Sequence, residues 1–293
     1  MPNGFSKYLE KFENMSPSTI ESYIRVIATL NSYLSKTYKT SDLHPSEITH
    51  TDLINFIKSK EEEGFSTKTI NKNISIIKKY FDYLDRFNFI PLDIAAKLKR
   101  KKLNLDDHKP LNHSYEDLQK VKRAVLHNTE YSTKRILIFL LALEGLFPAD
   151  FHFYRNNVIF ENERSIIKDA EGKTMISWGK EETNILYLYM WETSYIESDY
   201  VLFTKKRSSR LYGPIEQDNI SKHLNIVCKD YDLPKLSLYD IRSYMADHYY
   251  NELGLPIQEI ANRLRIKKAS AAALVETSAL KFRKHLEIKK NLV

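Results

Sequence analysis

Apolar residues recur at steps of three and four along much of this chain, and this spacing constrains the fold more than any other feature. From Ile20 to Leu34, and again from Ile70 to Leu84, the apolar side chains fall on one side of a helix. Seven glycines and nine prolines among 293 residues are too few for a loop-rich or fibrous chain. The sequence therefore predicts a mainly α-helical globular protein.

Serine and threonine mark where the first helices begin. Ser16 has the form of an N-cap, and Pro17 follows at the first helical position, where its missing N–H costs nothing. A second helix is expected over residues 49–63, with Thr49 or Thr51 as its cap. After a glycine break, a third helix is expected to start at Ser66-Thr67.

The length and the charge distribution indicate two domains with different surfaces. A chain of 293 residues exceeds one typical core. Its net charge of +7 permits a polyanionic partner, and residues 1–103 hold most of the excess, with 17 basic and 12 acidic side chains. We expect one domain over residues 1–103 and a second over residues 104–293.

Five of the six residues from Lys97 to Lys102 are basic. Like charges in such a run repel one another, so we expect a flexible linker or a strap that follows DNA phosphates, with a nuclear-import signal as the alternative. The helix expected from Thr67 to Leu84 carries amide, hydroxyl and lysine groups opposite its apolar face. Such a face suits phosphates and base edges, although a merely solvated surface has the same composition.

The second domain is expected to be helical around a small antiparallel sheet. Helices are expected over residues 115–126 and 133–146. Two or three strands are expected to follow, over 157–160, 164–168 and 175–178, with a turn at 170–172, and helices should dominate from residue 185 to the end. Cys228 is the only cysteine, which excludes an internal disulfide. The first nine residues lack the apolar core of a signal peptide, and no run approaches the ~20 apolar residues that span a bilayer. We therefore expect a cytoplasmic protein that is not associated with a membrane.

Taken in order, these segments resemble the tyrosine recombinase (phage integrase) family. The shared features are a Ser/Thr-rich cap at residues 16–19, a second helix start after Gly64-Phe65-Ser66-Thr67, a basic linker and a helical domain with a three-stranded sheet. Tyr200–Phe203 matches the family's Tyr-Leu-Phe strand, and Ile257–Leu264 matches the start of its Ile-Gln-x-x-Leu-Gly-His helix. The resemblance implies an N-terminal four-helix, SAM-like core-binding domain followed by a catalytic-like domain.

The catalytic positions of the family carry other residues in this chain. Its Thr-Gly-Leu-Arg turn aligns with Glu144–Phe147, and its His-x-Leu-Arg-His box aligns with Tyr239–Ser243, where Arg242 keeps an arginine. The nucleophilic tyrosine falls on a valine, and no tyrosine follows Tyr250. Lys168 or Lys173 could match the family's hairpin lysine. The four replaced positions are Phe147, Tyr239, Ile266 and Val275.

The residues replaced at these positions are ones that the recombination reaction of the family requires. The family's reaction uses a phenolate that attacks phosphorus, two guanidinium groups and a general acid. Losing one charge-stabilising donor costs about 10²- to 10³-fold in rate. We expect no strand exchange, no cofactor and no metal. The alternatives are a misaligned active recombinase, or an enzyme with an unexpected nucleophile such as Ser270 or Thr277.

By resemblance, the two domains should grip double-stranded DNA, in the cytoplasm of a bacterial host and in association with its nucleoid. The residues expected to bind it in the first domain and linker are Ser66, Thr67, Lys68, Asn71, Lys72, Lys79, Lys99, Arg100 and Lys101. Those in the second domain are Lys205, Lys206, Arg207, Arg210, Arg242, Arg263, Arg265, Lys267 and Lys268. Asn71 and Lys72 have the groups to read adenine and guanine. A structural ion pair of Arg242 with Asp150 or Asp240 is the alternative to a phosphate contact.

A DNA-binding protein without cleavage suits a transcriptional repressor. The master repressors that hold SPbeta-like temperate phages in lysogeny resemble inactive tyrosine recombinases, and this chain is similar to them in that respect. An accessory or architectural recombination factor is the alternative. Residues 269–292 are expected either to dock on a second copy or to fold back on their own domain. The target sequence, the oligomeric state and the releasing signal, whether a regulatory peptide or an antirepressor protein, are not readable from the sequence.

Overall fold

The computed structural model describes residues 4–40, 43–102, 114–205 and 211–290, and of residues 282–290 the backbone alone. Contacts within the chain define two compact units, Met1–Asp107 and His108–Val293, called here the N-unit and the C-unit. The dividing point and the predicted domain boundary both lie between residues 103 and 113, outside the described residues.

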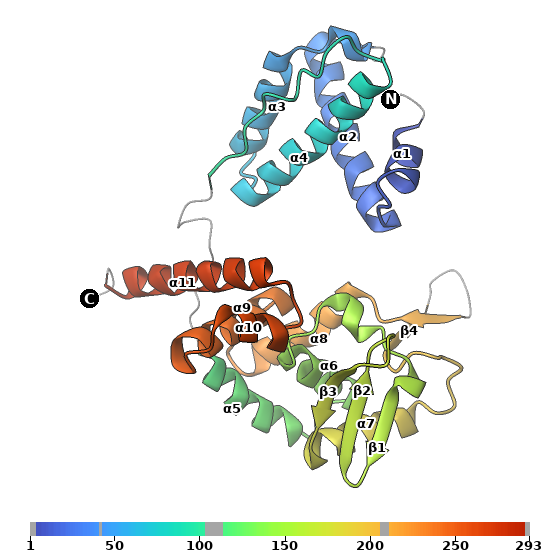
Figure 1. Cartoon of the computed structure of the whole chain (residues 1–293), viewed down its shortest axis with the longest axis vertical. Helices are drawn as coiled ribbons and strands as arrows, with labels where there is room; N and C mark the ends of the chain where they lie inside the picture. Colours follow the sequence, from blue (N-terminus) through green and yellow to red (C-terminus); the bar gives the residue numbers. More distant parts are fainter. Residues whose placement is uncertain (1–3, 41–42, 103–113, 206–210, 291–293) are drawn as a thin grey trace. The chain divides into compact units, whose positions relative to one another are not determined.

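The N-unit is helical throughout its regular structure (Figure 1). Its elements are α1 (Phe5–Lys11), α2 (Pro17–Tyr38), a 3₁₀ turn (Pro45–Glu47), α3 (His50–Glu62) and α4 (Thr67–Arg86). The side chains of Ser16, Thr49 and Ser66 accept hydrogen bonds from backbone N–H groups in the first turns of α2, α3 and α4. The predicted helix starts are therefore confirmed. The sequence had not located α1.

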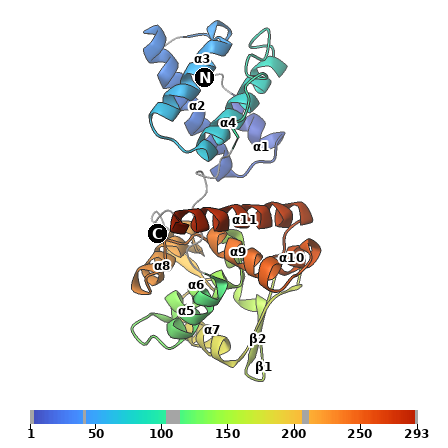
Figure 2. The same cartoon turned by 90° about the vertical axis from the view of Figure 1, so that its left-hand side faces the viewer.

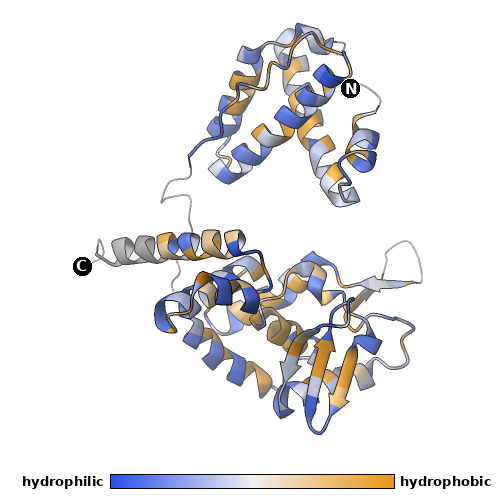
Figure 3. Cartoon of the chain, in the orientation of Figure 1, coloured by the Kyte–Doolittle hydropathy of each residue, from blue (hydrophilic) through white to orange (hydrophobic). Residues whose placement is uncertain are grey.

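One apolar core holds these four helices together. The predicted stripe of α4, which includes Ile70, Ile77 and Phe81, is buried against apolar residues of α2 and α3. Figure 3 shows the apolar residues of the N-unit gathered on the sides where its helices face one another. Phe5 of α1 packs edge-on against Tyr80 with ring centroids 5.0 Å apart, and this contact ties α1 to α4.

The C-unit combines helices with two small sheets. Its regular elements up to the second sheet are α5 (Tyr115–Leu126), α6 (Thr133–Leu143), β1 (Val158–Glu161), β2 (Arg164–Lys168), β3 (Thr174–Trp178), α7 (Lys180–Glu192), β4 (Phe203–Lys205) and β5 (Tyr212–Pro214). They are followed by α8 (Gln217–Asp230), α9 (Leu238–Asp247), a π-helical turn (His248–Glu252), α10 (Ile257–Arg263) and α11 (Lys268–Lys290). None of the described helices is long and apolar enough to span a bilayer.

The three-stranded sheet confirms the predicted α+β character. Its strands run antiparallel in the order β1-β2-β3. The turn between β2 and β3 needs Gly172, which has φ +79°, and the Asp169 carboxylate accepts from two backbone N–H groups there. A buried hydrogen bond of 3.0 Å from Thr183 to Ser165 joins α7 to β2.

Two expectations about the C-unit need correction. The helix predicted to extend to residue 146 ends at Leu143, because Gly145 adopts φ +71°, a left-handed conformation that does not continue an α-helix. A larger residue is disfavoured at this position, since a Cβ there would lie 3.0 Å from Sδ of Met245. Helices dominate from residue 185 to the end, as predicted, and β4 and β5 form a second antiparallel pair among them. The strand expected at Tyr200–Phe203 begins only at its last residue.

The last helix, α11, packs on its own unit. It lies along α9 and against α10 in both views (Figures 1 and 2). Ala271, Leu274, Val275 and Ser278 form its buried stripe. The sequence had left open whether this segment folds back or docks elsewhere, and through residue 281 it folds back.

The packing of α6 on α8 places His223 beside two cations and yields a prediction about pH. Burial, together with the charges of Lys134 and Arg135, lowers the pKa of His223 to about 4. Between pH 6.5 and about 4 the unfolded chain therefore binds a proton at His223 that the folded protein does not. We expect the free energy of unfolding of the C-unit to fall as the pH drops through this window.

Urea unfolding at a series of pH values, followed by tryptophan fluorescence, measures this dependence, because Trp178 and Trp191 both lie in the C-unit. His223→Gln should flatten the profile, whereas His127→Gln, at an exposed position, should leave it unchanged. Parallel profiles for all three proteins would contradict the prediction.

Candidate nucleic-acid interface

A basic groove on the N-unit is formed by α4 and the segment after it. The groove has a volume of about 510 Å³. Its lining residues are Lys68, Asn71, Lys72, Ser75, Arg100 and Lys101. The four residues from α4 follow helical spacing and share one face, and five of the six were predicted from the sequence as DNA-binding. Four of the six carry a positive charge, so the groove attracts anions.

Residues 97–102, called here the basic strap, are held against α4 by their backbone. The side-chain amide of Asn71 donates to the carbonyl of Lys101 (2.8 Å) and accepts from its N–H (2.7 Å). Lys78 donates to the carbonyl of Leu98 (3.1 Å), and the Leu98 side chain is buried. Arg100 in turn donates to Ser75 (2.8 Å). The strap is therefore a fixed wall of the groove.

This arrangement bears on two points that the sequence left open. Of the alternatives for residues 97–102, the structure favours a strap over a flexible linker, because hydrogen bonds to α4 and one buried leucine offset the repulsion among its charges. Asn71 has the groups to read a base edge, but here its side-chain amide is occupied by the backbone of Lys101. Lys101 also forms an ion pair with Glu61, and Lys72 donates to Ser22 (2.7 Å).

The other predicted residues of the N-unit lie outside the groove lining. Ser66 caps α4, and Thr67 is its first residue. Lys79 pairs with Glu13 at 2.9 Å, a carboxylate that also accepts from Tyr8. The hydrogen bond that Lys79 donates to Glu13 raises the pKa of Lys79 above its ordinary value, as expected of a structural ion pair. Lys99 is exposed and lines a neighbouring depression over α3.

In the C-unit, Arg242 is buried and bonded to two backbone carbonyls. Only 2% of its surface is exposed. Its guanidinium donates to the carbonyls of Gly145 and Leu264, and the ring of Phe147 covers it with a centroid distance of 3.8 Å. Burial, together with the nearby charge of Arg265, lowers the pKa of Arg242 to about 10. In this geometry Arg242 has no free donor surface for a DNA phosphate.

The alternative ion pairs of Arg242 do not form either. The carboxylate of Asp150 accepts from the N–H of Phe147 at 2.7 Å. Asp240 instead pairs with Lys281 at 3.0 Å. Both alternatives from the sequence therefore give way to a third arrangement, in which backbone carbonyls hold the guanidinium.

Arg265 repeats this arrangement at the position of the family's glycine. Its backbone has φ +52°, in the left-handed region that glycine adopts most easily. Its guanidinium donates to the carbonyls of Met175 (2.7 Å) and Glu144 (3.2 Å). Glu144 also accepts a hydrogen bond from the indole of Trp178 (2.9 Å). Arg265 thus joins the end of α10 to β3 and to the end of α6.

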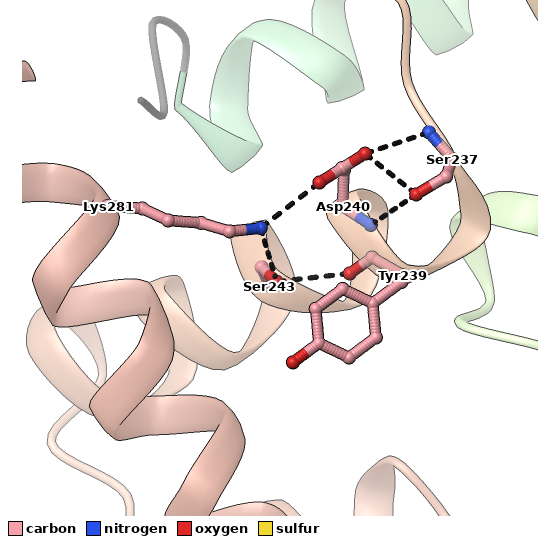
Figure 4. Close-up of polar contacts among 5 residues, drawn as sticks. All are labelled: Ser237, Tyr239, Asp240, Ser243 and Lys281. Atoms are coloured by element: carbon pink, nitrogen blue, oxygen red, sulfur yellow. Dashed lines mark hydrogen bonds and ion pairs between the residues drawn. The ribbon is translucent and has the colours of Figure 1, made fainter. Parts of the chain in front are cut away.

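The sequence had missed a buried lysine on α11. Lys281 is 5% exposed and reaches α9, where it donates to Asp240 and to Ser243 (3.3 Å) above the ring of Tyr239 (Figure 4). Burial alone would raise the pKa of Asp240, but hydrogen bonds from Ser237 and the charge of Lys281 hold it below its ordinary value. The sequence did contain an indication of this pair. Lys281 falls on the apolar stripe of α11, and a lysine buried at such a position requires an acidic partner.

The four replaced catalytic positions have different surroundings. Phe147 and Tyr239 are exposed, Ile266 is half-buried and Val275 is buried on α11. Lys168 ends β2 and is half-buried, whereas Lys173 is exposed in the following turn. Among the described residues, no three His, Cys, Asp or Glu side chains are placed to hold a metal ion.

The remaining predicted residues of the C-unit are on its surface or outside the described part. Lys205 ends β4, and Lys267 and Lys268 precede or begin α11, all three exposed. Arg263 is exposed and paired with Glu259 at 3.1 Å. Three predicted residues, Lys206, Arg207 and Arg210, lie outside the described residues.

This fold is that of the tyrosine recombinases. The XerH site-specific recombinase bound to a palindromic difH substrate matches with a TM-score of 0.69 and 15% identity, covering 97% of this chain and 85% of that chain. A lambda integrase (75–356) dimer bound to a COC′ core site matches with a TM-score of 0.63 and 12% identity, covering 92% of each chain. The Tn1549 transposon integrase (aa 82–397) in complex with circular intermediate DNA also matches with a TM-score of 0.63 and 12% identity, covering 92% of each chain.

The sequence comparisons are narrower in extent. Residues 3–87 match the family model described as "Phage integrase, N-terminal SAM-like domain". No curated protein matches the chain. The predicted fold, a helical SAM-like domain followed by a recombinase-like domain with a three-stranded sheet, is thus confirmed.

The Lys281–Asp240 pair yields a prediction about stability. Lys281→Ala should lower the free energy of unfolding by about 3 kcal/mol, because Asp240 would be left without its charged partner. Lys120→Ala is the control, since its pair with Asp117 is exposed and should contribute less than about 1 kcal/mol. Urea unfolding measures both values, and equal losses would contradict the prediction.

Proposed function

We propose that this protein binds double-stranded DNA without cutting or rejoining it and acts as a transcriptional repressor. The observation that carries the DNA-binding part is the basic groove, in which α4 and a fixed strap present four cations on one face. Phosphate contacts supply much of the affinity of DNA-binding proteins. The recombinase-like fold adds support, because the three matched recombinases are bound to DNA.

The fixed strap favours binding energetically. A flexible cationic segment loses conformational freedom when it is ordered on DNA, at a cost of about 1–2 kcal/mol for each backbone residue. Here Asn71, Ser75 and Lys78 of α4 already hold the strap in place. The groove is thus preorganised to accept a phosphate backbone.

The absence of strand exchange is proposed from the replaced positions. A phenylalanine, a tyrosine, an isoleucine and a valine stand where the family has an arginine, two histidines and its nucleophile, at Phe147, Tyr239, Ile266 and Val275. The retained Arg242 is occupied by the carbonyls of Gly145 and Leu264. In this proposal Arg242 has a structural role in the C-unit, and the exposed cations of the C-unit add to the binding of DNA.

The repressor role follows from what such a binder can do. A protein that occupies a DNA site without altering it blocks other proteins from that site. A role in holding a prophage in lysogeny fits this activity and the resemblance to the repressors of SPbeta-like phages. An accessory recombination factor would need the same grip, so the two roles differ only in where the protein binds.

The groove can be tested by its salt dependence. Lys68→Ala/Lys72→Ala should weaken binding to duplex DNA and reduce the magnitude of the slope of log K against log salt by about 2, because about 0.9 is lost for each phosphate contact. Lys36→Ala, an exposed lysine of α2 outside the groove, is the control. Fluorescence anisotropy with a labelled duplex measures both. An unchanged slope in the double variant would remove the groove from the interface.

Cleavage and regulation are tested in turn. Purified protein incubated with supercoiled and suicide DNA substrates should give no nick and no covalent adduct, and either product would defeat the non-catalytic proposal.

Genome-wide occupancy and transcripts, with and without the protein, should show binding at promoters with derepression when it is removed. Binding confined to an attachment site would instead support an accessory role in recombination.

A further inference from the structure

The outer face of α7 exposes a group of large apolar side chains. Tyr187, Leu188 and Trp191 lie on one side of the helix, and Tyr195 follows directly after it, 81% exposed. Trp191 is 66% exposed. Phe160 of β1 extends this group, with its ring edge-on to Tyr187 at 5.7 Å. These five residues are called here the α7 outer face.

The fold does not require this face to be apolar. The opposite side of α7 is buried against the sheet and α6 through Thr183, Leu186 and Tyr189. A helix that packs on one side normally carries polar residues on the other. Clusters of exposed aromatic residues are typical of surfaces that bind other proteins, because tyrosine and tryptophan dominate binding energies.

The charge around the α7 outer face is opposite to that of the chain. Residues 158–200 contain nine acidic and four basic side chains, whereas the whole chain has a net charge of +7. Glu181, Glu192 and Glu197 are exposed on or beside α7. Acidic groups repel phosphates, so this surface does not suit nucleic acid. The charge complementarity favours a cationic occupant.

We propose that the α7 outer face is a docking site for a partner protein, which binds through a segment that combines apolar and basic residues. Its aromatic rings would cover the apolar side chains of the segment, and the surrounding carboxylates would pair with its lysines or arginines. The site is independent of the basic groove, which lies in the other unit. Occupation of the α7 outer face therefore need not compete directly with DNA for the groove.

The test uses the full-length protein and two synthetic helical peptides of about 18 residues, long enough to form a helix. One contains leucine and lysine, and the other has the same leucine positions with glutamate in place of lysine. Trp191 reports binding, because Trp178 is 4% exposed and held by Glu144. The leucine–lysine peptide should shift the tryptophan emission to shorter wavelength and saturate. The glutamate peptide should bind at least about tenfold more weakly, although the net charge of the protein would attract it.

Three variants locate the site. Tyr187→Ser/Tyr195→Ser should weaken the lysine peptide by at least about tenfold, and Glu181→Lys should weaken it as well. Leu253→Ser, at an exposed apolar residue elsewhere in the C-unit, should change neither binding nor emission. Groove-dependent DNA binding should be the same in all variants.

Other outcomes would overturn the proposal. Equal binding of both peptides, or equal binding by Tyr187→Ser/Tyr195→Ser and the unchanged protein, would show that the α7 outer face is not the site. Sedimentation that shows a dimer of the protein alone, lost on Trp191→Ser, would assign the face to a second copy of this chain. Failure of the lysine peptide to bind at all would also refute the predicted partner chemistry.

Discussion

The C-unit depends on cations placed at the ends of helices. The last carbonyls of a helix have no partner within it and carry partial negative charge. Arg242 binds the carbonyl of Gly145 just after α6 and that of Leu264 at the end of α10, while Arg265 binds the carbonyl of Glu144 at the end of α6. Two arginines thus fix α9, α10 and the turn after α6 to one another. In the family that this chain resembles, this region carries the chemistry.

The N-unit applies a related principle at its surface. The basic strap would repel itself if it were free, and α4 prevents this by binding its backbone through Asn71 and Lys78. The lysine and arginine side chains are then presented along a fixed groove. Repulsion among them is relieved most by a polyanion, which links the local hydrogen bonds to the proposed DNA-binding function.

The two units also divide the charge of the protein. Most of the basic excess lies in the first 103 residues, whereas the segment around α7 is acidic and exposes aromatic rings. A single chain can therefore present one surface to a polyanion and another to a cationic protein. The fold of a recombinase is compatible with such a division, because fold alone does not fix function.

The sequence by itself determined the helix starts at Ser16 and Ser66 and the three-stranded sheet, and it narrowed the start of α3 to Thr49 or Thr51. Five of the six residues that line the groove were among its DNA-binding predictions. Capping and periodicity are local properties, so neighbouring residues suffice to read them. Only the tertiary structure decided that the strap is fixed, that Arg242 is buried and that Lys281 pairs with Asp240. Each of these depends on groups between 20 and 97 positions apart along the chain, such as Lys78 with Leu98 and Arg242 with Gly145. The sequence pattern does not encode which distant partner a charge will meet.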